Sequence, residues 1–480
     1  MSEPIRDQGL APAQSVVEDG LAAARPGSDG CIVLLEEASE VEIRFANNTP
    51  TTNGSRRDRR VTVVCLRAGE QGVAAGVARR SGDVDIRELV RAAEEDAAGC
   101  PPAEDAFPLL ETVSGTAPRG VPGDAATRFA GPPASTDLSV LGAVLSDLSA
   151  AFRRAKGDDI VLAGFAEHRH TTDYLGTSCG VRLAHAQPTG ALHLVARSPD
   201  GTRSTWVGTG TPLFTDVSVP ELEAVLRSRL ARASYRVELP AGRYEVILPP
   251  AAVADLMVGL AFEASGRAAE DGRSVFSAPG GRTRVGEQLS SLPFDLWSDP
   301  QAPGLECAPF LAVSNSSVDT SVFDNALDLP RTDWISGGRL SRLRYHRAGA
   351  ARSGVEPAGF IDNLVLELPG ATGSLEDLVS RTERGLLLTC LWYIREVDPV
   401  SMLLTGLTRD GVYVVEDGKV LGAVNNFRFN ESPVDLLARA SEVGESVRAL
   451  GREYGEYFNR TRMPALRIPD FNMSSVSQAS

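Results

Sequence analysis

Several signatures of common protein classes are missing from this sequence of 480 residues. The six cysteines are scattered and no Cys-x-x-Cys pair occurs, so the usual sequence sign of a structural zinc site or a dithiol redox site is absent. No stretch approaches the roughly 18–20 consecutive apolar residues of a membrane-spanning helix. No GxxxxGK[ST] phosphate loop occurs, and no repeat of fixed period. We therefore expect neither a helical membrane protein nor a P-loop nucleotide-binding protein.

Cationic residues are outnumbered by anionic ones. The 48 Lys and Arg face 63 Asp and Glu, which gives a formal net charge of −15 at pH 7. A nucleic-acid surface needs clustered Lys and Arg to neutralise phosphates, so this charge argues against a nucleic-acid partner and favours solubility. The opening segment MSEPIRDQGLAPAQSVVEDG lacks the basic start and apolar core of a secretory signal. We expect a cytoplasmic protein without a membrane partner, whose cysteines are reduced thiols.

The length exceeds that of one ordinary hydrophobic core, so two or three domains are expected. Composition and periodicity predict an α+β protein in which a mixed α/β N-terminal half is followed by a strand-rich C-terminal domain. The predicted parts are a mobile polar tail over 1–27, an N-terminal α/β domain with a Pro/Gly-rich linker over 28–135, a helix-plus-meander region over 136–238, and a β-rich domain over 239–480.

Local patterns predict individual elements within these parts. Two alternating strand patterns are separated by the polar segment NNTPTTNGSRRD, residues 47–58, which we interpret as a loop. An amphipathic helix with an acidic start and a Gly stop is expected over 83–99. Glu416-Asp417-Gly418 is typical of a hairpin bend, residues 434–451 predict a late helix, and 464–475 predict a terminal strand.

The stretch GLAFEASGRAAEDG, residues 259–272, follows an apolar run with helical spacing. Metallopeptidases often place His and Glu on such a helix, so that imidazoles hold a metal and the carboxylate handles protons. Here Glu263 is present, but Phe262 precedes it and Arg267 lies four residues after it. The two positions at which such a helix would carry its metal ligands are thus occupied by an aromatic ring and a cation.

Four segments, taken in their order and spacing, resemble the TldD/PmbA family of bacterial and archaeal metallopeptidases. They are FEASGRAAEDGRSVF, RTERGLLLTCLWYIR, LTGLTRDGVYVVEDGKVLGAVNNFRF and PALRIPDFN. The TldD branch carries a His-Glu-x-x-x-His helix and a Cys near the C-terminus, which bind zinc. The PmbA branch, also called TldE, lacks these ligands and forms a heterodimer with TldD around a closed cavity.

On that pattern, Phe262 stands at the first His and Arg267 at the second, with Glu263 retained. Phenyl offers no lone pair, and a guanidinium repels a divalent cation. No Cys or His follows Cys390, and GREYGEYFNRTRMP occupies the region of the expected Cys. The resemblance therefore implies a TldE-like chain that binds no zinc itself, with zinc and catalysis in a TldD-like partner.

Glu263 remains a vestigial candidate for a general base, since a carboxylate on a cavity-lining helix can have a raised pKa. The alternative is a structural role, in an ion pair with Arg267 one helical turn on. Cys307 and Cys390 stand in apolar surroundings, which favours inert core thiols over nucleophiles.

Histidines offer a second possible metal site. His168 and His170 lie two apart, hence on one face of a strand, and His185 and His193 follow on neighbouring strands. The alternative is that all four are polar residues of a meander without a ligand.

The segment GGRLSRLRYHRAGAARSG, residues 337–354, is rich in cations. Its side chains could receive the carboxylates of a peptide or an acidic patch of a partner, and the alternative is a solvated or disordered loop. The residues concerned are Arg339, Arg342, Arg344, His346 and Arg347.

The expected function is the non-catalytic subunit of a heteromeric zinc metallopeptidase that degrades or processes small or unfolded peptides. A self-associating peptide-binding scaffold, present as a homodimer, is the first alternative. The second is an autonomous hydrolase with a relocated site, for instance at His168 and His170.

Overall fold

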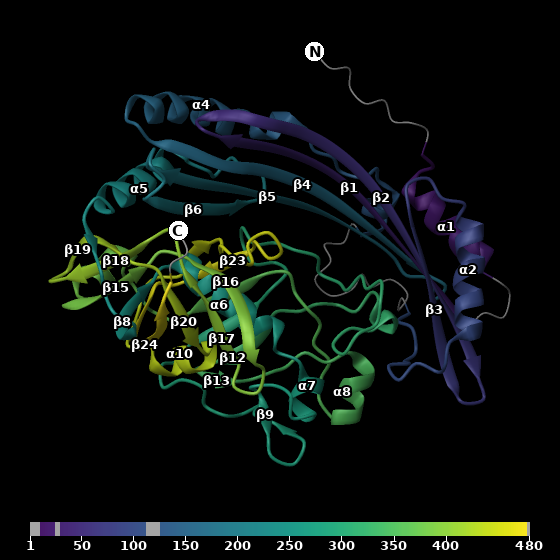
Figure 1. The fold of residues 1–480 in the computed structure, drawn as a ribbon. Coiled ribbons are helices and arrows are strands. Elements are labelled where there is room, and N and C mark those ends of the chain that lie inside the picture. Colours follow the sequence, from purple (N-terminus) through teal and green to yellow (C-terminus); the bar gives the residue numbers. More distant parts are fainter. Residues whose placement is uncertain (1–9, 25–28, 112–124, 478–480) are drawn as a thin grey trace.

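The computed structural model describes residues 10–24, 29–111 and 125–477 of the chain. Two parts can be distinguished in it. A long, curved antiparallel sheet with five α-helices and a 3-10 helix forms the described N-terminal part, and a strand-rich domain lies beneath its concave side (Figure 1). The expected α+β fold with a strand-rich C-terminal region is confirmed.

The N-terminal sheet has the strand order β3-β2-β1-β4-β5-β6, and every neighbouring pair is antiparallel. The strands are β1 (Gly30–Ala46), β2 (Thr49–Gly69), β3 (Gly72–Ser81), β4 (Val161–Thr177), β5 (Arg182–Arg197) and β6 (Ser204–Thr211). The helices of this part are α1 (Ala13–Ala23), α2 (Ile86–Gly99), α3 (Ala125–Ala130), the 3-10 helix η1 (Leu138–Leu141), α4 (Gly142–Gly157) and α5 (Val219–Arg232).

Most of the polar segment 47–58 is strand rather than the predicted loop, because β2 begins at Thr49. Asn47 and Asn48 adopt positive φ values of 50° and 58° and make a tight turn, a conformation that Asn tolerates better than most residues. From Thr49 to Leu66, β2 pairs with the full length of β1. The residue types of this segment do not favour a strand, but pairing with β1 satisfies its backbone hydrogen bonds. Strand formation thus depends more on pairing than on intrinsic preference.

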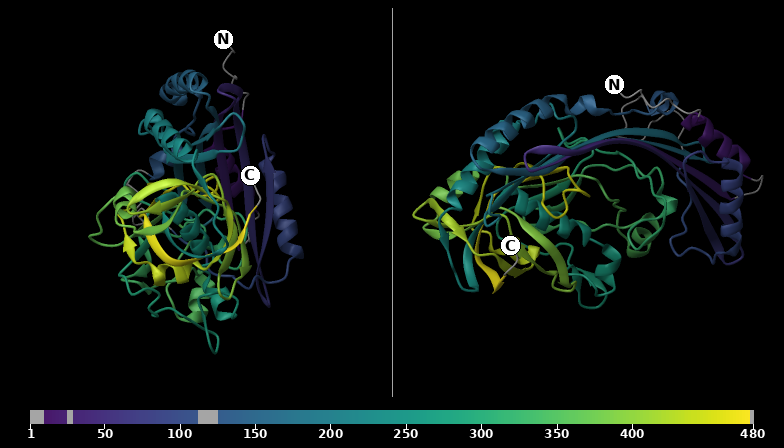
Figure 2. Two further views of the ribbon diagram at one scale, coloured as in Figure 1. Left: turned by 60° about the vertical axis from the view of Figure 1, so that its left-hand side comes forward. Right: turned by 45° about the horizontal axis from the view of Figure 1, so that its top comes forward.

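Both faces of this sheet are buried where its strands are apolar. Val33, Leu35 and Val63 pack with α1 and α2 on one face, and the same face continues to α4 and α5. On the opposite face, Ile32 and Leu175 contact the C-terminal domain. Figure 2 shows α1, α2 and α4 on the outer side of the curved sheet. The period-two alternation therefore places one set of side chains against helices and the other against the second part.

Two predicted boundaries need correction. Residues 161–211 continue the sheet begun by β1, so the boundary expected between 135 and 136 falls inside one structural unit. In the tail expected over 1–27, Ala13–Ala23 is helix α1, and its Val16 and Val17 are buried against the sheet. The buried residues of α1 are Ala13, Val16, Val17 and Gly20, which recur every three to four positions. They therefore form one face of the helix, and this face packs against the sheet. Residues 1–9 and 25–28 of that tail lie outside the described residues.

The C-terminal domain contains two larger sheets. One comprises β7 (Arg236–Val237), β8 (Gly242–Leu248), β15 (Arg384–Leu388), β16 (Leu391–Asp398), β17 (Leu403–Thr408), β18 (Val412–Glu416), β19 (Lys419–Val424), β20 (Phe427–Glu431), β21 (Glu442–Val443) and β24 (Leu466–Val476). The other comprises β11 (Asp295–Ser298), β12 (Thr332–Ser336), β13 (Arg339–Leu340), β14 (Leu364–Glu367), β22 (Val447–Ala449) and β23 (Thr461–Met463).

The remaining elements of this domain are short, apart from one central helix. They are α6 (Pro250–Phe262), α7 (Gly266–Glu270), η2 (Val322–Asp324), α8 (Arg347–Ser353), α9 (Leu375–Ser380), α10 (Pro433–Arg439) and the hairpin of β9 (Ser277–Ala278) and β10 (Arg282–Thr283). Helix α6 is buried on all sides in the main core cluster. Such a helix is apolar all round, so it forms the centre of the domain.

Turn chemistry predicted the local structure well in two places. Asp417 and Gly418 both have positive φ and join β18 to β19, as expected for this bend. The side chain of Asp85 caps α2 by accepting from the backbone N–H groups of Arg87 and Glu88. The late helix is shorter than predicted: it ends at Arg439, and Glu442–Val443 pairs with β24 instead.

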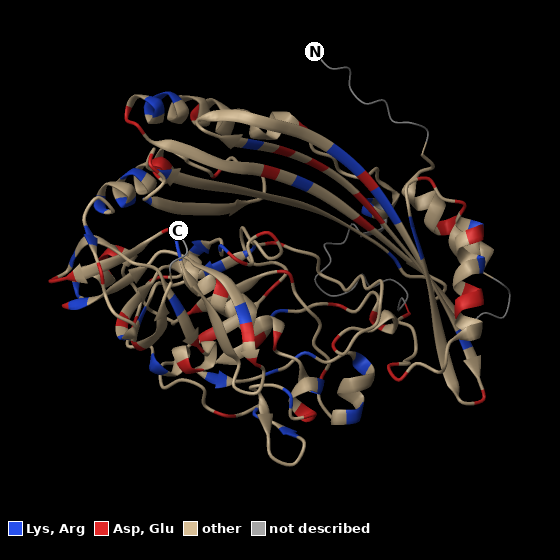
Figure 3. Ribbon diagram, in the orientation of Figure 1, with Lys and Arg blue, Asp and Glu red and all other residues tan. Residues whose placement is uncertain are grey.

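Charges of both signs are interspersed along the long strands (Figure 3). Glu36 lies 2.8 Å from Arg169 on β4 and 3.7 Å from Arg60 on β2, and Glu37 accepts from Arg59. These cross-strand pairs compensate charge across the middle of the sheet. No helix among the described residues is long and apolar enough to cross a membrane.

Gly76 on β3 is predicted to be essential for the packing of α2. A Cβ there would lie 2.1 Å from the backbone nitrogen of Ala97 and 2.2 Å from the carbonyl oxygen of Ala93. Gly76→Ala should therefore lower the free energy of unfolding by about 3 kcal/mol or more. Gly54→Ala on β2, where a Cβ meets nothing within 4 Å, is the matched control and should change it little. Urea unfolding of both variants measures the difference, and equal stability of the two would contradict this account of the packing.

Candidate functional site

Helix α6 stops before the second position of the expected metal motif. Phe262 is its last residue, and Glu263 is its C-cap, whose N–H donates to the carbonyl oxygens of Ala261 and Gly259. Ser265 then caps the separate helix α7 by accepting from the N–H of Ala268. The continuous helix that would carry residues 262 to 267 in one frame is therefore interrupted, because Ser265 favours a new helix start.

Arg267 lies away from Glu263 as a result of this break. Its guanidinium is half exposed and pairs with Asp271 at 3.0 Å within α7, so the ion pair predicted between Glu263 and Arg267 is not formed. Instead, Arg267 lines a polar cleft together with Glu104 and Arg352. Of the two positions at which the family pattern has His, the structure places only Phe262 at the end of α6.

Phe262 is the centre of a group of four rings, which we call the aromatic cluster: Phe262, Phe360, Tyr454 and Phe458. Its ring centroid lies 6.2 Å from that of Phe360 in a stacked arrangement. Tyr454 and Phe458 meet it edge-on, at 5.7 Å and 6.1 Å. These distances and angles are in the favourable range for aromatic pairs. The half-buried ring is therefore held on three sides by other rings.

Tyr454 and Phe458 come from the 451–460 loop, within the segment that the sequence analysis placed at the missing cysteine. Asp255 of α6 holds this loop: its carboxylate accepts from the backbone N–H groups of Arg452, Glu453 and Tyr454 at 2.8, 3.0 and 3.0 Å. Asp255 is completely buried, and burial raises its pKa to about 7, while the three N–H groups act in the opposite direction.

The same loop joins the two parts of the molecule. The guanidinium carbon of Arg452 lies 4.9 Å from the ring centre of Trp206 on β6 and 4.2 Å from that of Trp392 on β16. Cation–π contacts of this kind gain strength when the cation is desolvated. Arg460 donates to Asp362 at 2.6 Å and to the carbonyl oxygen of Pro188 on β5 at 3.2 Å. The loop that closes the aromatic cluster thus also contacts the N-terminal sheet.

A polar group borders the aromatic cluster. Arg344 donates to the carbonyl oxygen of Phe262 at 2.6 Å and to Asp319 at 3.1 Å, and Ser265 donates to the other oxygen of Asp319. Burial raises the pKa of Glu263, and the nearby Glu396 adds to this effect, while Arg344 opposes it. No side-chain hydrogen bond of Glu263 is found within the described part of the chain. A half-buried carboxylate with a raised pKa is therefore present at the end of α6.

The cation-rich segment 337–354 is ordered rather than a solvated loop. It contains β13 and α8, and His346 caps α8 by accepting at Nδ1 from the N–H of Gly349. Arg347 is paired with the buried Asp324 at 2.8 Å, and Arg339 donates to the carbonyl oxygen of Gly286. Arg342 is the exception: within the described part of the chain, its guanidinium has no partner.

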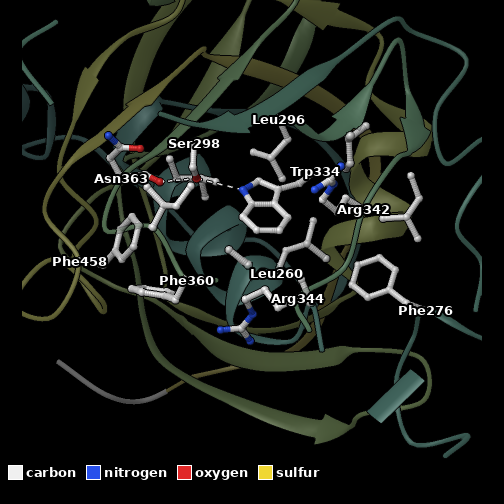
Figure 4. A pocket seen from close by; sticks show the side chains of 16 residues that line it. Leu260, Phe276, Leu296, Ser298, Trp334, Arg342, Arg344, Phe360, Asn363 and Phe458 are labelled. Carbon is white, nitrogen blue, oxygen red and sulfur yellow. Dashed lines mark hydrogen bonds between the residues drawn. The ribbon is translucent and has the colours of Figure 1, made fainter. Parts of the chain in front are cut away.

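An apolar pocket lies directly beside the aromatic cluster and shares Phe360 and Phe458 with it (Figure 4). Its interior is nearly filled by these side chains and leaves room for about one water molecule. The other lining residues are Leu260, Ala261, Ala264, Phe276, Leu296, Ser298, Trp334, Ile335, Leu340, Arg342, Arg344, Ile361, Asn363 and Leu364. This set combines the end of α6, the β11–β12 region and Arg342 and Arg344 of the cation-rich segment.

His168, His170, His185 and His193 are distributed over β4 and β5 of the N-terminal sheet, and His170 Nδ1 and His193 Nε2 are buried without a hydrogen-bond partner. His168 is buried, with Nδ1 2.8 Å from the hydroxyl of Thr136, and its Nε2–H donates to the carbonyl oxygen of Pro212 at 2.7 Å. The rings of His168 and His170 are 6.4 Å apart, and burial lowers the pKa of both. His193 is stacked on Phe165, and burial lowers its pKa to about 3.

Over residues 10–24, 29–111 and 125–477, no group of three or more His, Cys, Asp or Glu side chains is placed to hold a metal ion. Cys307 and Cys390 are buried, and burial raises the pKa of each thiol to about 12. Both are therefore protonated near neutral pH, as expected of core thiols.

Three residues of the site were missed in the sequence. Asp255 had a visible signal, because a single carboxylate inside the apolar run AAVADLMVGL must be paired when that helix is buried. Phe360 and Asp319 carry no local signal, since their role depends on chain segments brought together only by the fold.

Residues 241–475 match the family model described as PmbA/TldA metallopeptidase C-terminal domain. Among solved structures, TldE from Thermococcus kodakarensis has a TM-score of 0.75 and 17% identity, covering 96% of this chain and 99% of that one. A "putative modulator of a DNA gyrase" from Thermotoga maritima has a TM-score of 0.72 and 17% identity, covering 92% and 95%. A protein of the same description from Bacteroides thetaiotaomicron has a TM-score of 0.71 and 14% identity, covering 96% and 99%. No curated protein matches the chain.

Removing the buried carboxylate should loosen the 451–460 loop. Asp255→Ala leaves three backbone N–H groups without their acceptor, so we expect a loss of about 2–3 kcal/mol in the free energy of unfolding at pH 5. Because the folded-state pKa of Asp255 is raised to about 7, its contribution is fully present below the ordinary Asp range and is lost as pH rises through 7. The difference between variant and wild type should therefore be smaller at pH 8 than at pH 5.

Asp85→Ala is the control for this measurement, since it removes an exposed helix cap and should cost about 1 kcal/mol. Urea titrations at both pH values, read by far-UV circular dichroism, give the comparison. A difference for Asp255→Ala that grows between pH 5 and pH 8 would contradict the assignment.

Proposed function

This chain belongs to the TldD/PmbA family, as its sequence segments predict, and we propose that it is the non-catalytic, TldE-like subunit of a heteromeric zinc metallopeptidase. The complex degrades or processes small or unfolded peptides in the cytoplasm. A TldD-like partner carries the zinc ion and the catalytic Glu. This chain completes the cavity and positions the peptide.

The observation that carries the proposal is the place of Phe262 in the aromatic cluster. At the position of the first zinc-binding His in the family pattern, the ring packs against Phe360, Tyr454 and Phe458. None of the three phenyl rings offers a lone pair to zinc, and burial raises the pKa of the Tyr454 hydroxyl to about 12, which keeps it protonated. Arg344 adds a positive charge next to the same rings, 5.8 Å from the centre of Phe360. These residues do not fit a zinc ion.

An exposed strip along one edge of the C-terminal domain supports the existence of a partner. β16 is the last strand in the order of the ten-stranded sheet. Its Tyr393 and Val397 are 45% and 56% exposed, and Val400 just beyond its end is 54% exposed. In the 451–460 loop, which Glu453 ties to β16 through Arg395, Tyr457 is 79% exposed. Exposed edge strands with large apolar side chains are typical of interaction surfaces.

The two alternative functions receive less support. An autonomous hydrolase at His168 and His170 is disfavoured, because both ring nitrogens of His168 already have hydrogen-bond partners. A homodimeric scaffold would use the same exposed strip, so solution mass with and without a TldD-like chain separates it from the heteromer.

Zinc content tests the proposal directly. After dialysis against a weak chelator, we expect zinc close to zero per chain for this protein and about one per chain for a TldD-like protein treated in parallel. Peptide hydrolysis should appear only when the two chains are combined, and His168→Ala should leave both results unchanged. Elemental analysis gives the first readout and cleavage of a fluorogenic peptide the second. A stoichiometric zinc content, or hydrolysis by this chain alone, would overturn the proposal.

A further inference from the structure

Two of the cysteines lie directly opposite each other across a strand pair. Cys31 on β1 and Cys65 on β2 are register partners in the antiparallel ladder, and both are free thiols. Their side chains lie on the same face of the sheet, because directly opposite residues of a ladder point the same way. The remaining cysteines lie outside the strands; they are Cys100, Cys179, Cys307 and Cys390.

The backbone hydrogen bonds show which kind of pair this is. Cys31 accepts from the N–H of Ser178 at 2.8 Å and donates its own N–H to the Ser178 hydroxyl at 3.0 Å, so both of its backbone groups point away from β2. On β3, the N–H of Val77 donates to Asp96 of α2 at 2.8 Å and also points away from β2. Because hydrogen-bonded and non-hydrogen-bonded pairs alternate along a ladder, the backbone groups of Cys65 face β3. Cys31 and Cys65 are therefore a non-hydrogen-bonded pair.

A pair of this kind has the spacing that a disulfide requires. The Cα atoms of a non-hydrogen-bonded antiparallel pair lie about 4.5 Å apart. Disulfides span Cα separations of about 4.4–6.8 Å, so the bond can form with little movement of the strands. The thiol of Cys31 already hydrogen-bonds to that of Cys65, and this contact is the first cause that raises the pKa of Cys31. The Cys65 thiol in turn donates weakly to the carbonyl oxygen of Val90 on α2, at 3.9 Å.

The pair lies in a packed layer where the two parts of the molecule meet. Cys31 and Cys65 are 0% and 1% exposed and pack with residues of α1 and α2. The next residues inward along the ladder, Ile32 and Val64, point to the opposite face and pack with Phe323 of the C-terminal domain. A cross-link here would therefore tie β1 to β2 at the place where the sheet is held between the helices and the C-terminal domain.

We propose that Cys31 and Cys65 form a reversible disulfide, which makes the β1–β2 pair a redox-responsive staple of the N-terminal sheet. The oxidant is a small-molecule disulfide such as glutathione disulfide. One cysteine thiolate displaces a glutathione from it and forms a mixed disulfide, and the thiolate of the other cysteine displaces the second glutathione. Two S–H bonds and the S–S bond of the oxidant break, the S–S bond of the protein forms, and the protons and electrons leave on two glutathione thiols. This inference does not depend on the peptidase role proposed above.

The test uses the full-length protein in urea just below its unfolding transition, where local opening exposes buried thiols while the fold is retained. It is incubated with glutathione disulfide, and a parallel sample with iodoacetamide measures the access to each thiol. Peptide mass mapping should find a link between Cys31 and Cys65, which dithiothreitol removes. After the urea is removed, the linked protein should unfold at a temperature about 5 °C higher than the reduced protein, because the cross-link restricts the unfolded chain.

Cys31→Ala should lose the linked peptide, and Cys307→Ala, which removes another buried thiol, is the matched control and should retain it. If Cys31→Ala does not fold, the mapping of the wild-type protein decides alone. The proposal is overturned if iodoacetamide reaches both thiols and no link forms, or if both thiols stay closed to either reagent while Cys100 and Cys179 react. A link that lowers the unfolding temperature would also overturn it, because the native strand geometry would then not accommodate the bond.

Discussion

The carboxylate of Asp255, which accepts three backbone N–H groups of the 451–460 loop, is the contact on which the candidate site depends. It fixes a loop without regular structure to the most buried helix of the molecule. Once the loop is fixed, Tyr454 and Phe458 reach Phe262, and Arg452 reaches between Trp206 and Trp392. The aromatic cluster and the junction between the two parts therefore share one anchor. A close fit enforces this arrangement, since a Cβ at Gly451 would lie 2.2 Å from the Asp255 carboxylate.

A buried carboxylate is costly in the centre of an apolar domain, and the protein compensates it with backbone donors rather than with a cation. Neutral donors leave the pKa of Asp255 high, whereas a paired arginine would lower it. Two of the arginines near the site pair with other carboxylates instead of Asp255. Arg344 joins Asp319 to the end of α6, and Arg347 holds the buried Asp324. Among these three arginines, only Arg342, on the wall of the apolar pocket, has a guanidinium without a hydrogen-bond or ion-pair partner within the described residues.

Local signals in the sequence were sufficient where capping and turn chemistry decide the structure. Asp85 begins α2, and Asp417-Gly418 joins β18 to β19, as their residue types predict. They were insufficient where pairing decides it: the polar first half of β2 is a strand because β1 provides its ladder. The candidate site divides in the same way. Phe262 was identified from the motif frame, whereas Phe360 and Asp319 come from distant segments with no pattern that links them to α6. The break at residues 263–265 was also missed, although Ser265 is a common helix start.

The aromatic cluster has a consequence for how this position can change over generations. A single exchange of Phe262 for His would place an imidazole among three rings, with its nitrogens unpaired and no second ligand beside it. A second histidine at 267 would stand on a different helix, where the present arginine points to Asp271. Each separate step toward a metal site would thus reduce stability before it brought any benefit. Because Phe262, Phe360, Tyr454 and Phe458 pack on one another and the 451–460 loop holds two of them, a metal site would have to be gained here through several simultaneous substitutions.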